Sequence, residues 1–320
     1  MITRLTRNAL ALLMLAALWA RRAQVGGQAV IEGVMMRGVE HWSLAVRRPD
    51  DTIGVHEFPL VSWMQRYPIL KTPVLRGVVA LVESLVIGVR ALTMSANESM
   101  GEEEQQLSRK ELGGTLFIAF AFAVGLFFVA PLFLTGLFKH WIGSGYMFWA
   151  VEGCVRVGIF LVYLAIITQI KDLRRVFEYH GAEHMSIHAL EHGEELTVEN
   201  VKNYGTLHLR CGTSFLLIVM LVAIFVFALV GRPVWYLLIL SRVILIPLIA
   251  GVSYEIIKFA GRHETSVFVR AAMAPGLALQ WMTTKQPDSA QVEVAIAALE
   301  KIIELEPQDR PPVQGVEVMA

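Results

Sequence analysis

The sequence concentrates potential metal ligands in one short segment. Four of its nine histidines and two carboxylates lie within the thirteen residues 180–192. His180 and His184 enclose Glu183 in a His-x-x-Glu-His pattern. On a helix these two imidazoles are one turn apart, about 6 Å along the axis, and can share one ion. Glu183 beside them could accept a proton from a metal-activated water, as in the inverted zincins. The pattern therefore predicts a divalent metal site, with zinc as the expected metal.

The same segment offers few further ligands for that ion. Glu191 faces the same way as His180 but lies about 16 Å further along a straight helix, which is too far. His188 could only join a second site. We interpret His188 and His192 as residues of a solvated face. A third ligand must therefore come from another part of the chain.

His208 and Cys211 supply the missing donors, because they lie three residues apart just before an apolar run. If both join His180 and His184, the nitrogen–sulfur set suits a closed, structural zinc site. If only three of the four bind, water can occupy the fourth position and catalysis becomes possible. Cys211 as a simple buried thiol is the alternative.

The composition places this segment in a membrane protein. The chain has 320 residues, 55% of them hydrophobic, and a mean hydropathy of +0.54. Its net charge is zero, so nothing favours nucleic acid as a partner. The two cysteines, Cys154 and Cys211, lie in different environments, so we expect no disulfide and a reducing compartment.

Four apolar runs are long enough to cross a bilayer, which takes about 20 helical residues. They are residues 115–138, 146–170, 215–230 and 234–252. A fifth, weaker run at 74–96 carries charges every seven residues on one face, so we interpret it as an interfacial helix. Lys and Arg gather on one side of the four spans, which predicts that both termini and the histidine-rich loop lie in the cytoplasm.

The parts outside the spans should be small. Residues 26–72 read as a β-rich part with two or three strands, and Asp288 with Gln291 should cap a helix over 289–304. The predicted organisation is mainly α, a multi-pass helical membrane protein with about four spans, a small β-rich N-terminal part and cytoplasmic helices. Its segments are an extension 1–25, the β-rich part 26–72, an interfacial helix 73–96, a first transmembrane pair 115–170, a histidine-rich loop 171–213, a second pair 214–252 and a C-terminal part 253–320.

Charges within the spans form a second group of candidate residues. Glu152 and Arg156 are four residues apart and can pair along a helix. Arg242 lies mid-span, where a lone charge costs at least about 3 kcal/mol, and Glu152 is its expected partner. A packing network and a polar cavity for a headgroup or an ion are both open. Glu255 could reach the histidine loop as a ligand or as a carboxylate behind the ligands.

Several motifs resemble the YqhQ-like bacterial membrane proteins, a family of unknown function. The matching stretches are residues 26–38, 179–184, 196–201, 210–215, 251–255, 275–280 and 287–295. The resemblance covers about residues 26–299. The family's motif residues are all present: His180, Glu183, His184, His208, Arg210 and Cys211. Met185 and Leu209 stand where the family usually has lysine and proline. The resemblance implies a multi-pass membrane protein, described as a candidate metal-dependent enzyme, with no established activity.

The leading hypothesis is a membrane-bound, metal-dependent, hydrolase-like enzyme at the cytoplasmic face. Glu183 would activate water, and Arg210 could hold an anionic substrate group. A protease and a lipid-headgroup hydrolase fit equally. One alternative is a non-enzymatic assembly protein with a structural zinc, and another is a transporter that uses the charges within the spans. Lipid is the expected partner, and a homo-oligomer stays open.

Overall fold

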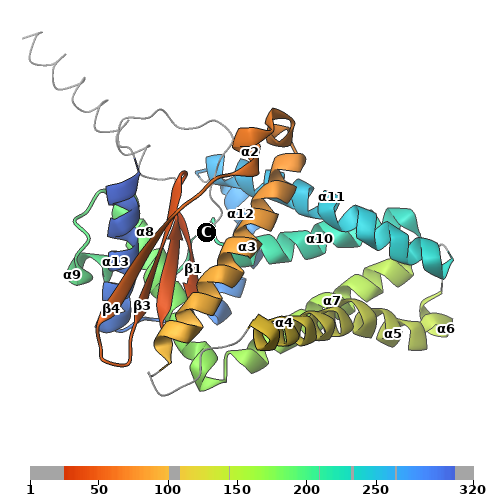
Figure 1. Cartoon of the computed structure of the whole chain (residues 1–320). Helices are drawn as coiled ribbons and strands as arrows, with labels where there is room; N and C mark the ends of the chain where they lie inside the picture. The colour runs from red at the N-terminus through yellow and green to blue at the C-terminus, as the bar shows by residue number, and fades with distance from the viewer. Residues whose placement is uncertain are drawn as a thin grey trace, which may run out of the picture.

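The computed structural model describes residues 25–100, 109–143, 145–208, 210–231, 234–263 and 265–306. The expected N-terminal extension lies almost entirely outside these residues. The described part is mainly helical, with one small antiparallel sheet near its N-terminal end (Figure 1). The mainly helical character and the small N-terminal sheet of the predicted fold class are confirmed.

The sheet has four strands, where the sequence predicts two or three. They are β1 (Gly26–Val30), β2 (Gly33–Arg37), β3 (His41–Arg47) and β4 (Ile53–Pro59), paired in the order β1-β2-β3-β4. The apolar stretch 28–37 is split by a tight turn at Glu32, whose φ is 49°. Asn and Gly mark such turns and Glu does not, so the sequence carries no turn signal there. The Glu32 carboxylate accepts hydrogen bonds from Arg175, which ties the turn to a later helix.

Helices cover both faces of the sheet (Figure 1). Because side chains alternate along a strand, Val34 and Met36 face helices α8 (Lys171–His192) and α13 (Ser289–Leu305). Met35 faces α3 (Leu75–Ser99) on the other side. The predicted apolar stripe of α13 docks in the first of these cores, and Asp288 with Gln291 forms the predicted capping box.

The remaining long helices form a bundle beside this layered part. They are α4 (Arg109–Val124), the π-helix η2 (Gly125–Val129), α5 (Ala130–Leu137), α7 (Tyr146–Ile167), α10 (Gly212–Val230), α11 (Trp235–Arg262) and α12 (Val267–Thr283). Short connecting helices are α2 (Trp63–Arg66), η1 (Pro68–Lys71), α6 (Lys139–Ile142) and α9 (Val198–Val201).

Five helices in the described part are long and apolar enough to cross a membrane, where the sequence predicts about four spans and an interfacial helix. The additional one is α3, over Leu75–Ser99. Its second half packs on the sheet through Ile87 and Ala91, and Glu98 pairs there with Arg48. Helix α3 therefore belongs to the sheet layer as much as to the bundle. Its length and composition alone do not distinguish a membrane span from a helix packed on a sheet.

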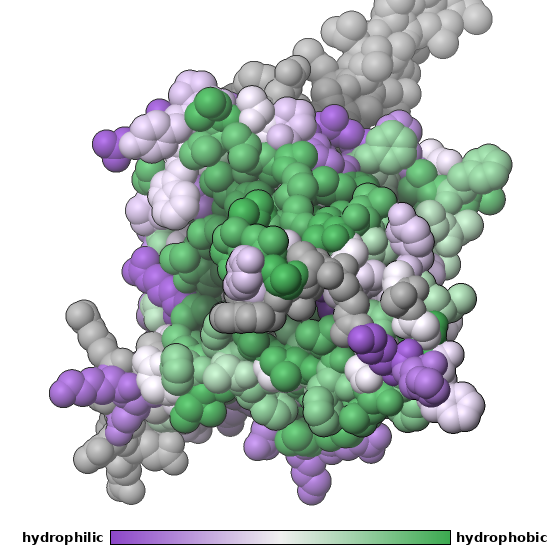
Figure 2. Space-filling view, turned by 90° about the vertical axis from the view of Figure 1, so that its right-hand side faces the viewer, coloured by the Kyte–Doolittle hydropathy of each residue, from purple (hydrophilic) through white to green (hydrophobic). Residues whose placement is uncertain are grey.

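The bundle presents apolar side chains outward. The run Gly113–Leu137 is strongly apolar, and only 6% of its most apolar 18 residues are buried. Figure 2, which looks at the helices from the side away from the sheet, shows hydrophobic side chains over most of the surface and polar ones towards its margins. A surface of this kind requires a cover other than water.

The layered part and the bundle meet at one end of the long helices. Helix α7 leads into α8, α10 begins directly after Cys211, and α12 ends at Thr283 beside α8. The candidate ligands of the histidine segment lie at this junction.

Candidate metal centre

Helix α8 positions the histidines, and the expected helical conformation of this segment is confirmed. One side of α8, with Tyr179, Ala182 and Met185, is buried in the core against the sheet. His180 and His184 occupy another side, with their ring centroids 4.4 Å apart. The helix ends at Gly193, a glycine in the left-handed conformation, as helix C-termini often do.

Both imidazoles are held by backbone carbonyls. His180 Nδ1 lies 2.8 Å from the carbonyl oxygen of Thr283, and His184 Nδ1 lies 2.5 Å from that of Thr206. A carbonyl oxygen can only accept, so each Nδ1 carries the proton and each Nε2 keeps its lone pair. Metal-binding histidines are commonly fixed in this way by a hydrogen bond at the other ring nitrogen.

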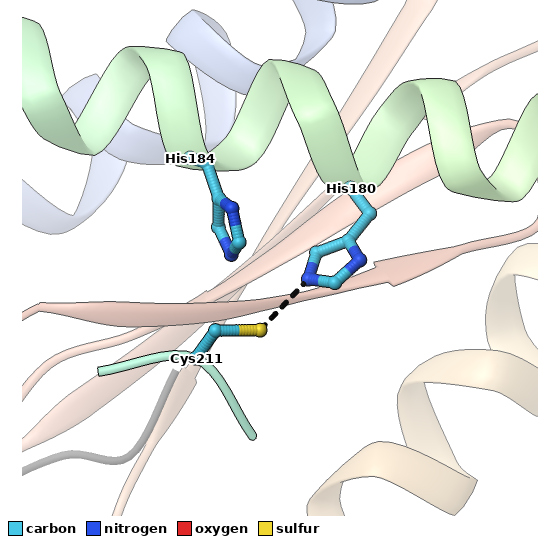
Figure 3. A group of neighbouring side chains, drawn as sticks. All are labelled: His180, His184 and Cys211. Carbon is cyan, nitrogen blue, oxygen red and sulfur yellow. Dashed lines mark hydrogen bonds between the residues drawn. The ribbon is translucent and has the colours of Figure 1, made fainter. Parts of the chain in front are cut away.

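Cys211 completes a group of three ligand atoms. Its Sγ lies 3.2 Å from His180 Nε2, and the atoms offered by His180, His184 and Cys211 all lie within 4.8 Å of one another. Figure 3 shows both rings, from one helix, directed at the sulfur from the start of α10. Tetrahedral zinc would separate a nitrogen and a sulfur ligand by about 3.6 Å, so this spacing fits with small adjustments.

The burial of the group supports a ligand between these atoms. His184 is fully buried, and its Nε2 makes no hydrogen bond within the described part of the chain. Burial lowers the pKa of His184, so its ring is neutral at neutral pH and able to bind a cation. Cys211 is 1% exposed and caps α10, where it receives the backbone N–H of Thr213 at 3.4 Å. Negative charge is favoured at such a helix start.

Glu183 lies against the same group. Its Oε2 is 4.0 Å from His180 Nε2 and 3.7 Å from His184 Nε2. It is 1% exposed, and burial raises its pKa, partly offset by the nearby histidines. Strand β1 covers it: a Cβ on Gly27 would lie 2.7 Å from Glu183 Cγ. A divalent cation beside the carboxylate would reverse the pKa shift, since opposite charge favours the ionised form.

The glycine within the motif has a packing role. A Cβ on Gly181 would lie 2.0 Å from the carbonyl oxygen of Lys285. The backbone N–H of Lys285 also donates to the carbonyl oxygen of Phe177 at 2.9 Å. Gly181 thus allows the segment after α12 to approach α8 closely enough for the Thr283 carbonyl to reach His180.

His208, expected in the first ligand set, instead faces a neighbouring group. Its Nε2 lies 3.3 Å from Glu191 Oε2, while its ring centroid is 5.6 Å from that of His184. His188, Glu191 and His208 form a second set of ligand atoms within 4.8 Å of one another. The structure therefore brings together three of the four predicted ligands and places the fourth beside them.

One further expectation about this region needs correction. His188 is not on a solvated face: its Nε2 lies 2.8 Å from the carbonyl oxygen of Leu207, and burial lowers its pKa to about 4. Arg210 forms an ion pair with Glu191, and its role towards an anionic substrate group stays a prediction. His192 is exposed, as predicted.

Gln280 of α12 fixes the segment that carries His208 and Cys211, a role that sequence reasoning missed. It is fully buried, and its side chain bonds both the N–H and the carbonyl of His208, at 2.8 and 2.7 Å, and Ser214 Oγ at 3.0 Å. Its position in a matched motif was the only available signal. No sequence signal could have pointed to the carbonyls of Thr206 and Thr283 that hold the two histidines, because every residue type has a backbone carbonyl.

The other predicted polar residues lie elsewhere. Glu255 pairs with Arg76 and accepts the N–H of Val74 at 3.2 Å, so it does not face the histidines. Glu152 pairs with Arg156, as predicted, whereas Arg242 lies over aromatic rings.

This geometry defines the class of the protein. It is a helical protein with a buried His-His-Cys group at the junction of a small sheet and an apolar bundle. A family model described as a protein of unknown function, DUF1385, matches residues 72–305. The chain belongs to this family, in agreement with the resemblance seen in its motifs. A Bacillus subtilis (strain 168) protein described as uncharacterized protein YqhQ is 34% identical over 294 residues, which cover 88% of this chain and 92% of that protein. No solved structure matches.

Proposed function

We propose that this protein is a membrane-bound, metal-dependent enzyme of hydrolase type that acts at the cytoplasmic face of the bacterial inner membrane. His180, His184 and Cys211 bind a divalent metal, and zinc suits this nitrogen–sulfur set. Glu183 is the general base.

The observation that carries this proposal is the convergence of two fixed Nε2 atoms and one sulfur in a buried position. Both Nδ1 atoms bond to carbonyls, at 2.8 and 2.5 Å, so the lone pair of each Nε2 is left for the group that includes Cys211 Sγ. The Nε2 of His184 makes no hydrogen bond to any described residue. A buried acceptor without a partner destabilises a protein by about 1–3 kcal/mol, and a bound cation removes that cost.

The number of ligands favours catalysis over a purely structural metal. His208 lies against Glu191, with 3.3 Å between Nε2 and Oε2, rather than with the other three ligands. Three protein ligands leave one position for water or substrate, as in catalytic zinc sites. Arg210 stabilises this arrangement by pairing with Glu191.

The chemistry follows from the placement of Glu183. A bound divalent ion would supply Lewis-acid chemistry, since it would acidify water and polarise a carbonyl or phosphoryl oxygen. Glu183 lies within 4.0 Å of both Nε2 atoms, so its Oε2 is placed to accept a proton from a water nucleophile and to return that proton to the leaving group. The burial of the site by β1 and α8 excludes bulk water, which strengthens these electrostatic interactions.

The membrane location rests on the bundle. The run Gly113–Leu137 is nearly unburied and strongly apolar, so lipid is its natural surrounding. Basic residues gather at the bundle end that carries the metal ligands, which by the positive-inside rule is the cytoplasmic end. They include Lys171, Arg174, Arg175, Lys258 and Arg262.

A structural zinc in a membrane assembly protein is the second candidate, because the His208 ring is only 5.6 Å from that of His184 and could close the site after a rotation. The two candidates differ in what Glu183 does. In an enzyme Glu183→Gln abolishes turnover and leaves metal bound, whereas in an assembly protein it leaves function intact.

The test uses the purified full-length chain in detergent with a panel of peptide and phospholipid substrates. Zinc-dependent hydrolysis should be lost in Glu183→Gln and retained in Glu195→Gln, a control at an exposed position outside the site. Metal content should be unchanged in both variants. Hydrolysis at the wild-type rate in Glu183→Gln would overturn the enzymatic proposal.

A further inference from the structure

A second polar site lies inside the bundle, away from the metal centre. Helix α7 carries Trp149, Glu152 and Arg156 at spacings of three and four residues, so they share one face. Their exposed fractions are 1%, 2% and 6%. Arg242 of α11 lies against the same face.

The group has an excess positive charge. Glu152 forms an ion pair with Arg156, and Arg242 forms no ion pair with a carboxylate in the described part of the chain, although Glu152 is near enough to attract it. One carboxylate and two guanidinium groups leave a net charge of +1. The guanidinium carbon of Arg242 lies 3.4 Å from the centroid of the Phe227 ring and 4.9 Å from that of Trp149. Phe227 also has Arg156 at 5.8 Å, so both cations flank one ring.

Three hydrogen-bond donors in this group are unused. Trp149 Nε1, Arg156 Nε and Arg242 Nη1 are closed off from solvent and make no hydrogen bond to any residue that the structure describes. Buried donors in native proteins nearly always have a partner. Aromatic rings can stabilise a guanidinium charge but do not satisfy its N–H groups. The group therefore lacks an acceptor, and its charge favours an anionic one.

We propose that this group binds a phosphate-type oxyanion. The planar fork of an arginine matches two oxygens of such a group, and the Trp149 N–H can supply a further bond. Glu152 pairs with Arg156 and limits the net positive charge of the group to one. This inference does not depend on the metal centre.

The position of the group suggests where the anion comes from. Trp149 is three residues from the start of α7, Phe227 three residues before the end of α10, and Arg242 seven residues after the start of α11. At 1.5 Å per residue these positions lie about 5–10 Å from the helix ends that are opposite the metal centre. A lipid headgroup at that membrane surface and a free phosphate entering from water can both reach this depth.

Native mass spectrometry of the full-length protein tests the proposal in two arms. One arm titrates inorganic phosphate. The other compares phosphatidylglycerol with diacylglycerol, which shares the acyl chains and lacks the phosphate. Saturable binding of one phosphate in the first arm identifies a free anion, and preference for phosphatidylglycerol only in the second identifies a headgroup. Failure to bind in both arms would overturn the proposal.

Two variants with opposite expected effects on anion affinity distinguish a binding role of these residues from a packing role. Arg242→Gln should weaken binding about tenfold or more, because it removes a charged hydrogen bond. Glu152→Gln should strengthen binding, because it raises the net charge. Arg90→Gln is the matched control, since Arg90 also lies over aromatic rings, 4.6 Å from the Phe58 centroid, but in the sheet layer. Wild-type affinity in Arg242→Gln, or weaker binding in Glu152→Gln, would contradict the proposal. If Arg242→Gln does not fold, the anion affinity of Glu152→Gln still tests the proposal.

Discussion

Gly181→Ala should destabilise the protein although alanine is the better helix former. In a free helix this change would gain about 1 kcal/mol. Here the new Cβ would lie 2.0 Å from the Lys285 carbonyl oxygen, whereas Cβ atoms essentially never come closer than 3.0 Å to another heavy atom. The two backbones must therefore separate by at least 1.0 Å, the difference between these distances.

That separation has a calculable cost. Overpacking of this kind costs about 1–3 kcal/mol. The hydrogen bonds from Lys285 N–H to the Phe177 carbonyl and from His180 Nδ1 to the Thr283 carbonyl, at 2.9 and 2.8 Å, are stretched as well. At about 1 kcal/mol each, their loss brings the net destabilisation to about 2–4 kcal/mol after the propensity gain is subtracted. Zinc affinity should fall too, because His180 loses the carbonyl that orients its ring.

The assay is thermal unfolding of the purified protein without metal, together with zinc affinity measured by competition with a chromophoric chelator. Gly158→Ala is the control, since Gly158 is also helical and a Cβ there would meet nothing within 4 Å. It should be neutral or slightly stabilising. If Gly181→Ala unfolds at the same temperature as Gly158→Ala and binds zinc as tightly as the wild type, the close approach of the two backbones is not what positions His180.

Three further predictions concern single side chains. Gln280→Leu removes all three side-chain hydrogen bonds of Gln280, so it should lower the free energy of unfolding by about 3 kcal/mol and weaken zinc binding. Gln65→Leu, at an exposed position, should change neither stability nor zinc affinity. Chemical denaturation measures the stability, and chelator competition measures the zinc affinity. Burial lowers the pKa of His188 to about 4 in the folded protein, from an ordinary value of about 6.5, so the folded state binds fewer protons and stability falls as the pH drops from about 6.5 to about 4. His188→Gln should remove this loss, which amounts to up to about 2 kcal/mol of the free energy of unfolding at about pH 5. An unchanged dependence of stability on pH would contradict the burial of a neutral His188. Burial raises the pKa of Glu183 above its ordinary value of 4.5, so the charged carboxylate destabilises the metal-free protein at neutral pH. Metal-free Glu183→Gln should therefore be more stable than the wild type at neutral pH and should lose this advantage below about pH 4.5. Thermal unfolding measured across this pH range tests the prediction.

Much of the candidate metal centre could be predicted from the sequence because the grouping of its histidines depends on helix periodicity. The spacing of His180 and His184 places them on one side of α8, and the same arithmetic correctly separates Glu191 from them. Cys211 could be proposed because it is a potential ligand at the start of an apolar run. These predictions need only the rise and turn of a helix.

The remaining details depend on tertiary contacts that leave no local signal. His208 turns towards Glu191 because Gln280 fixes its backbone, and nothing near His208 in the sequence shows this. His188 shares a side of its helix with the polar residues His184, Glu191 and His192, but it is covered by Tyr204, whose ring stacks 6.2 Å away, and by the Leu207 carbonyl.

The sheet shows the same limit. Glu32 takes the left-handed conformation at the β1–β2 turn, and its carboxylate is bound by Arg175, about 140 residues later in the chain. Turn propensity treats Glu as a poor candidate for this position, so the hairpin is visible only once the long-range ion pair is known.

Zinc K-edge X-ray absorption of the purified full-length protein tests the central claim most directly. Two nitrogen ligands at about 2.0–2.1 Å and one sulfur at about 2.3 Å are predicted for the wild type. Cys211→Ser should lose the sulfur shell, and His184→Ala should lose stoichiometric zinc. Absence of bound metal in the wild type, or a spectrum with no sulfur shell, would contradict the assignment of His180, His184 and Cys211 as a metal centre.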